Sequence, residues 1–202
     1  MAETAGSPRP RSTAVWYWRM VWAMLRLKQL KLDEPRHVAK SVKGWSAESL
    51  DTLIEESRRE HDSQERSLDR ILSRSQLLFT TDLALLAFYG TVASAVWADS
   101  SLAWAVCLQH VLLVAAGLVL VFALLGSASL IASRKPFEGV SAVVMSKWEV
   151  FDLERLANDY TGSLATGDMT NNAHLSVFGS VVRMTLLAPL LGGLGWVVAQ
   201  VF

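Results

Sequence analysis

The segment Leu102–Ala132 reads LAWAVCLQHVLLVAAGLVLVFALLGSASLIA and contains no charged residue. A helix needs about 20 residues, at about 1.5 Å each, to cross roughly 30 Å of hydrocarbon, so this segment is long enough to span a bilayer. Two further stretches qualify: residues 77–98, where Asp82 is the one charge, and residues 184–202, which have none. We therefore predict an all-α integral membrane protein with three transmembrane helices, at 77–98, 102–133 and 184–202.

The charges that flank the spans give the predicted orientation. Cationic residues stand before the first span and directly after the second, namely Arg70, Arg74, Arg134 and Lys135, whereas Asp99 is the only charge between these spans. Because cationic flanks stay in the cytoplasm, the N-terminus is expected there, the C-terminus outside, and the protein in the plasma (inner) membrane. A tight outer hairpin at 98–101, flanked by Trp97 and Trp104 as interfacial aromatics, fits this orientation.

Outside the spans, composition divides the chain into further segments. These are a disordered tail (1–13), a basic, aromatic interfacial helix with its linker (14–45), a charged cytoplasmic helix (46–76) and a cytoplasmic helical linker (134–183). Residues 14–32 mix tryptophans with cations, a composition that suits either an anionic membrane surface or docking on the protein itself. The N-terminus lacks the apolar core of a signal peptide, so no cleaved signal is expected.

Ser46 is predicted to cap a long helix that continues into the first span, because no Gly or Pro interrupts the chain up to Tyr89. Along this helix a heptad seam with a polar middle recurs at alternating steps of four and three: Leu50, Ile54, Ser57, His61, Gln64, Leu68, Ile71 and Ser75. The seam either packs within the chain or joins copies of it. In the second case Ser57, His61 and Gln64 form an oligomer contact or a ligand pocket.

The linker before the third span is predicted to contain a break. Gly162 and Gly167 should mark a connection after a helical segment at 140–160. Asp168 is then placed to cap a final helix that enters the third span, where Pro189 should kink it.

Asp82 is the most informative polar residue, because a carboxylate within hydrocarbon costs about 2.5 to 3.5 kcal/mol at the bilayer centre and is usually paired or functional. Arg183, at the cytoplasmic mouth of the third span, is its expected partner. Asp82 is either an interhelical anchor or part of an ion path or gate. The other polar pair predicted inside the membrane is His110 bonded across the hairpin to Tyr89.

Small residues share helix faces in two spans: Ala87, Thr91 and Ala95 in the first, and Ala188, Gly192, Gly195 and Ala199 in the third. Such faces allow close packing, either within the chain or between copies. The histidines lack metal-ligand spacing and no catalytic or nucleotide-binding motif is present, so we expect no metal, no cofactor and no enzymatic activity. The tryptophans of the basic arm favour lipid over specific nucleic acid.

Several segments together resemble the transmembrane effector modules of Pycsar and the related SLATT group of bacterial conflict systems. They are SRSQLLFTTDLALLAFYGT at 73–91, SRKPFEG at 133–139, DLERLANDY at 152–160 and NNAHLSVFGSVVR at 171–183. The resemblance implies a small multi-span helical protein that is held quiet until a nucleotide signal arrives and then compromises the membrane. The chain is also similar to three-span actinobacterial proteins linked to plasmid transfer.

These observations predict an oligomerising membrane effector in a defence system, with Asp82 and Arg183 at the inner mouth of the spans. The alternative is a passive scaffold or accessory subunit, for example in plasmid transfer. The expected partners are the lipid bilayer, further copies of the chain, and a cyclic nucleotide or a cytoplasmic protein. No separate cyclic-nucleotide-binding domain fits in the sequence, so a partner or the polar seam would have to supply that site.

Overall fold

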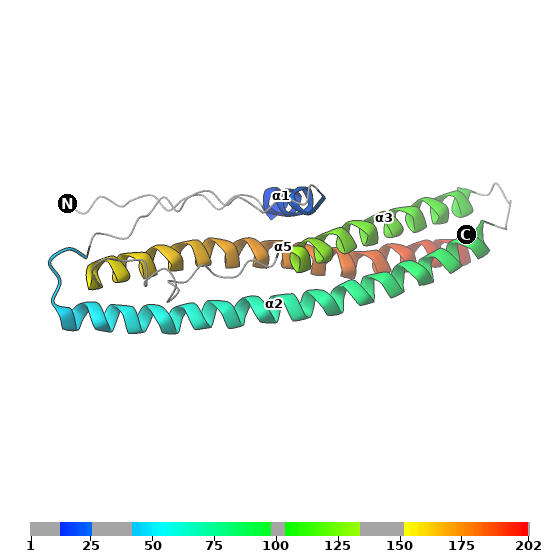
Figure 1. Ribbon diagram of the computed structural model, residues 1–202. Helices are drawn as coiled ribbons and strands as arrows, with labels where there is room; N and C mark the ends of the chain where they lie inside the picture. Colours follow the sequence, from blue (N-terminus) through cyan, green and yellow to red (C-terminus); the bar gives the residue numbers. More distant parts are fainter. Residues whose placement is uncertain (1–12, 26–41, 98–103, 134–151, 202) are drawn as a thin grey trace.

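The computed structural model describes residues 13–25, 42–97, 104–133 and 152–201. In this part of the chain all regular structure is helical: α1 (Thr13–Leu25), α2 (Ala47–Val96), α3 (Trp104–Ala132) and α5 (Leu153–Val201) (Figure 1). Three of them, α2, α3 and α5, are long and apolar enough to cross a membrane, as predicted. The predicted disordered tail and most of the linkers lie outside the described residues.

Helix α2 begins where the sequence predicts. Ser46 is extended, and its Oγ accepts a hydrogen bond from the Ser49 backbone N–H at 3.3 Å. The helix then continues for 50 residues, about 75 Å, so the charged helix and the first span are one rod. The predicted continuity is confirmed, because no residue in this rod breaks the backbone hydrogen-bond pattern.

Helix α5 differs from the prediction. Its cap is Asp152, whose Oδ1 accepts from the Glu154 N–H at 2.9 Å, and the helix runs unbroken to Val201. The predicted connection at Gly162 and Gly167 and the predicted cap at Asp168 are therefore wrong. A glycine inside a helix costs about 1 kcal/mol, which tertiary packing can offset, and Gly167 is buried in the bundle.

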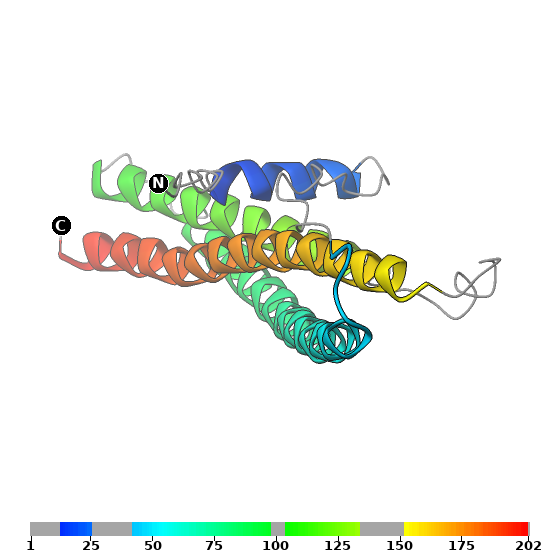
Figure 2. The ribbon, with the colours of Figure 1, turned by 90° about the vertical axis from the view of Figure 1, so that its left-hand side faces the viewer.

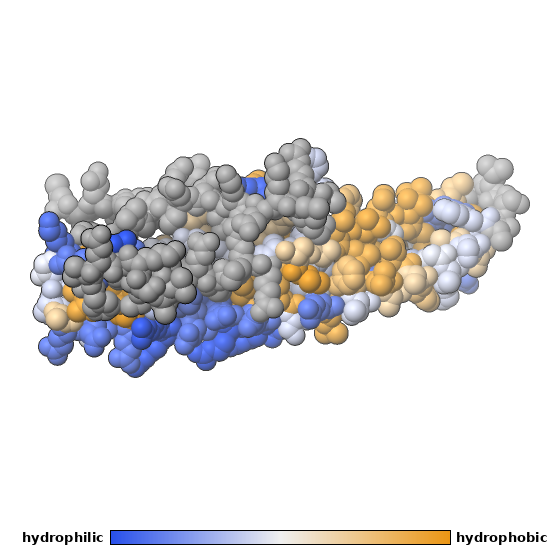
Figure 3. All heavy atoms as spheres, viewed as in Figure 1, coloured by the Kyte–Doolittle hydropathy of each residue, from blue (hydrophilic) through white to orange (hydrophobic). Residues whose placement is uncertain are grey.

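The three long helices form one bundle in which α2 and α5 run parallel and α3 runs antiparallel to both (Figures 1 and 2). The parallel register changes by only one residue between these two levels: Gln64 bonds to Asp168, 104 positions later, and Asp82 bonds to Thr185, 103 positions later. Hydrophilic residues gather where α2 begins and hydrophobic residues cover the other end (Figure 3). The bundle therefore has a polar stalk that continues into an apolar half long enough to cross a membrane, called the membrane half below.

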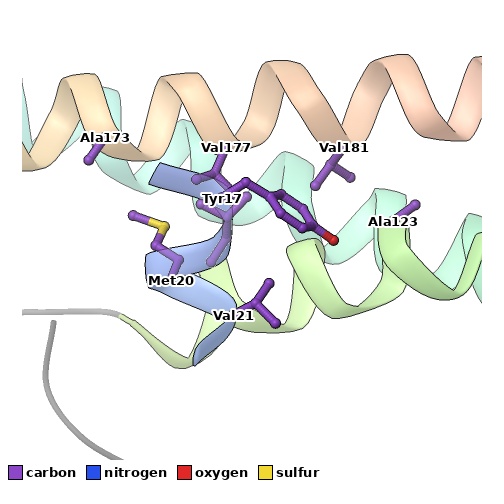
Figure 4. Packing of buried hydrophobic residues seen from close by; sticks show 8 residues of the cluster. Tyr17, Met20, Val21, Ala123, Ala173, Val177 and Val181 are labelled. Carbon is purple, nitrogen blue, oxygen red and sulfur yellow. The ribbon is translucent and has the colours of Figure 1, made fainter. Parts of the chain in front are cut away.

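Helix α1 docks on α3 and α5, on the side away from α2 (Figures 1 and 2). Its buried side chains Tyr17, Met20 and Val21 pack against Ala123, Leu130, Ala173, Val177 and Val181 (Figure 4). The Tyr17 hydroxyl donates to the carbonyl oxygen of Phe122, and burial raises the pKa of Tyr17 to about 12. Of the two expectations for this segment, docking on the protein is thus observed for one face of α1.

Gly126 makes this docking close. A Cβ added to it would lie 2.6 Å from Cγ2 of Val181 and 2.7 Å from Cε2 of Tyr17, so Gly126→Ala forces α1 or α5 to move. We predict a loss of about 1–3 kcal/mol in stability, as for other overpacked cores, and faster tryptic cleavage at Arg19 in α1.

The matched control is Gly117→Ala in the same helix, where an added Cβ meets no atom within 4 Å. Thermal unfolding and limited proteolysis in detergent should leave this control like the wild type. Equal behaviour of the two variants would contradict the close docking of α1 at Gly126.

Candidate functional site

Buried polar side chains form a line between α2, α3 and α5 that passes from the stalk into the membrane half. This buried polar seam comprises Ser57, Gln64, Ser75 and Asp82 of α2, Gln109, Ser127 and Ser129 of α3, and Thr170, His174 and Thr185 of α5. Such groups are costly to bury unless they are hydrogen-bonded, so their bonding decides what the seam can do.

At the stalk end the seam is closed by α5 of the same chain. The Gln64 Nε2 donates to Oδ1 of Asp168 at 2.7 Å and to the carbonyl of Leu164 at 3.4 Å, and its Oε1 has no protein partner. Ser57 is buried and His61 half-buried on the same face of α2. The predicted heptad seam therefore packs within the chain, and a role for Ser57, His61 and Gln64 in an oligomer or a ligand pocket stays a prediction.

His174 joins α5 to the end of α3. Its Nδ1 donates to the Thr170 carbonyl at 2.8 Å, which leaves Nε2 to face the Ser133 hydroxyl at 3.1 Å. Burial lowers the pKa of His174 below its ordinary value, and the bond to Thr170 opposes this in part. Burial therefore favours the neutral imidazole. In the sequence, the one signal for its burial is its spacing from Thr170 and Val177, which places it on the inward face of α5.

Asp82 lies inside the membrane half and is 0% exposed. Its Oδ1 accepts from the Thr185 hydroxyl at 2.7 Å, whereas Oδ2 has no protein partner. Arg183 is exposed, so the predicted Asp82–Arg183 pair is not formed. The physical reason is helical geometry: Arg183 precedes Thr185 by two positions, about 200° around the helix, and so faces outward when Thr185 faces Asp82.

Pro189 removes one backbone donor from α5, one turn after Thr185. Proline has no N–H, so the carbonyl of Thr185, four residues earlier, lacks its helical donor. In the bonded pair Asp82–Thr185, the Oδ2 of Asp82 still needs a donor or a positive charge. A proton, a water molecule or a small cation has the chemistry to satisfy it.

Tyr89 and His110 are not brought together. The Tyr89 hydroxyl donates to the Ala188 carbonyl at 3.2 Å, while His110 donates from Nδ1 to Val106 at 2.6 Å and stacks on Trp97 with 6.2 Å between ring centroids. The predicted His110–Tyr89 bond is therefore wrong. Its premise was a hairpin turn at 98–101, and these residues lie outside the described part of the chain.

The small residues of the third span serve packing within the chain. Ala188, Gly192 and Gly195 are buried, and a Cβ at Gly192 would overlap the Tyr89 ring. The face formed by Ala87, Thr91 and Ala95 is exposed instead. Close approach of α5 to α2 therefore holds the outer end of the bundle together.

Protonation of His174 should destabilise the fold. Because its folded pKa is lowered, the unfolded chain binds the proton more readily, and stability falls as the pH drops below the ordinary value of 6.5. His174→Gln keeps a hydrogen-bonding side chain that does not titrate. We predict that unfolding temperatures measured against pH in detergent fall less steeply for His174→Gln than for the wild type; parallel curves would contradict this.

Substitution at Gly192 tests the Tyr89 contact. Gly192→Ala should displace the Tyr89 ring, break its bond to the Ala188 carbonyl and cost about 1–3 kcal/mol by overpacking. Gly193→Ala is the matched control, because an added Cβ there meets nothing within 4 Å. Thermal unfolding should show a lower unfolding temperature for Gly192→Ala than for Gly193→Ala. The opposite order would contradict the close contact between Gly192 and Tyr89.

Among the described residues, no group of three or more His, Cys, Asp or Glu side chains is placed to hold a metal ion. Comparison of the chain with family models, characterised proteins and solved structures gives no match.

Proposed function

We propose that this chain is a membrane effector module whose buried polar seam is a closed path for ions, and that opening of the seam permeabilises the membrane. In this proposal the protein lies in the plasma membrane with the stalk in the cytoplasm and the C-terminus outside. The resemblance to Pycsar and SLATT modules leads to the same class of function, and opening would involve further copies of the chain.

The observation that carries the proposal is the Asp82–Thr185 pair. A fully buried carboxylate with one oxygen unsatisfied is expensive in a membrane span, and the bond to Thr185 offsets that cost at one oxygen only. Ser127 of α3 is also fully buried, and its Oγ has no hydrogen-bond partner in the protein. Unsatisfied oxygens inside apolar spans are suited to bind water or a cation when the helices separate.

The test is flux through liposomes that contain the purified protein and an encapsulated dye, with and without cyclic pyrimidine nucleotides. The wild type should release dye or dissipate a membrane potential. Asp82→Asn and Thr185→Val should slow this by about tenfold, because each interaction is expected to lower the permeation barrier by about 1.4 kcal/mol. Thr185→Ser keeps the hydroxyl and is the matched control, with flux near that of the wild type.

Liposomes that stay tight under every condition, although the protein is inserted, would contradict the proposal. They would favour the second candidate, a scaffold. The observation behind that candidate is the exposed charged face of the α2 stalk, where Arg59 and Glu55 pair at 2.6 Å with both side chains more than 60% exposed. Such a face offers a long surface to a cytoplasmic partner without any opening of the bundle.

A further inference from the structure

Helix α1 has a second face that the docked core does not use. Val15, Trp18 and Trp22 recur at steps of three and four, so they share one side of the helix, and Trp18 and Trp22 are 54% and 55% exposed. Tyr17, Met20 and Val21 are buried against α3 and α5 on the other side. The outward face therefore presents large amphipathic rings away from the bundle.

The docking contacts place α1 at the boundary between the stalk and the membrane half. Tyr17 reaches Gly126 and Val181, and Val181 is two residues before Arg183, the last charged residue of α5. Residues of α2 and α5 that lie side by side differ by 103 in number, as Asp82 and Thr185 do. Arg74 of α2 is therefore level with Val177, which packs against the buried side chains of α1. The apolar half of the bundle begins at this level.

The outward face of α1 is continuous with the apolar surface of the spans. The Trp18 ring meets the Phe122 ring edge to face, with 5.8 Å between centroids. Phe122 in turn belongs to a row of exposed apolar side chains on α3: Leu108, Val111, Val114, Leu118, Val121 and Phe122. A membrane that covers this row therefore ends against Trp18.

Exposed cations surround the same level. Arg70 and Arg74 of α2 and Arg183 of α5 are all exposed. Tryptophan rings with arginines at the edge of an apolar belt match the headgroup region of an anionic leaflet, where rings sit at the interface and cations meet lipid phosphates.

We propose that α1 is a two-sided strap: its inner face binds the α3–α5 groove, and its outer face, Val15, Trp18 and Trp22, binds the anionic cytoplasmic surface of the bilayer. The strap fixes the depth of the bundle in the membrane and sets the level of Asp82 just inside the headgroups. This assignment needs a membrane position for the bundle but no ion flux, so it stands apart from the proposed permeabilising function.

Spin labels on single cysteines test the strap in vesicles of phosphatidylcholine with or without phosphatidylglycerol. The one native cysteine, Cys107, is first replaced by serine. Labels at Trp18→Cys and Trp22→Cys are compared with Ser63→Cys on the exposed stalk and Leu118→Cys on the exposed span. Collisions with oxygen, which enters lipid, and with a water-soluble nickel complex give the depth of each label.

Labels at 18 and 22 should lie between the two controls in depth, and phosphatidylglycerol should reduce their contact with the nickel complex. The triple variant Arg70→Gln, Arg74→Gln, Arg183→Gln should remove that lipid dependence. Labels as water-exposed as the one at 63 in both vesicles would overturn the proposal. Labels shielded from both reagents would also overturn it. Spin coupling between such labels would then indicate contact with a second copy, and no coupling would indicate burial within the chain itself. Should a tryptophan variant fail to fold, Val15→Cys on the same face replaces it.

Discussion

A carboxylate inside a membrane span must find its hydrogen-bond donors within the protein, because lipid tails supply none. Asp82 meets this constraint through Thr185, and the 2.7 Å bond between them fixes α2 and α5 in a parallel register. The same register places Gln64 beside Asp168 in the stalk and the Tyr89 ring beside Gly192 at the outer end, where the Tyr89 hydroxyl bonds to the Ala188 carbonyl. The two long helices are therefore locked together at three levels by polar contacts, and α3 fills the third side of the bundle.

The polar contacts are unevenly satisfied. His174 and Tyr89 have partners for their polar atoms, whereas Asp82 Oδ2, Gln64 Oε1 and Ser127 Oγ have none in the protein. If every buried polar atom of the seam had a hydrogen-bond partner, the seam would simply make the bundle rigid. Because some atoms have none, the seam depends on water, protons or cations to supply the missing partners. This difference is why we assign the seam to ion passage and assign the docked α1 to positioning in the membrane.

The sequence was sufficient for the spans, the long α2 rod and its Ser46 cap, because charge-free length and helix caps are local signals. It also placed Asp82 as the central polar residue. It did not predict the hydrogen-bond partners. Arg183 for Asp82 and His110 for Tyr89 were predicted from their depth along the spans, whereas hydrogen bonding also depends on which way each side chain faces around its helix and on the register of the helices. The breaks predicted at Gly162 and Gly167 failed because tertiary packing stabilises α5 through both glycines. Burial of His174 had no local signal beyond its helical spacing.

The most direct test of the central claim is the accessibility of residue 82 during current flow. Asp82→Cys in a Cys107→Ser background is placed in a planar bilayer, and a charged thiol reagent is added on the stalk side while current is recorded. We predict that the reagent modifies residue 82 only when the bilayer conducts, and that modification changes the current, because the seam is closed in the resting bundle. Modification without conduction, or conduction that is unchanged by complete modification, would contradict the assignment of the seam as the ion path.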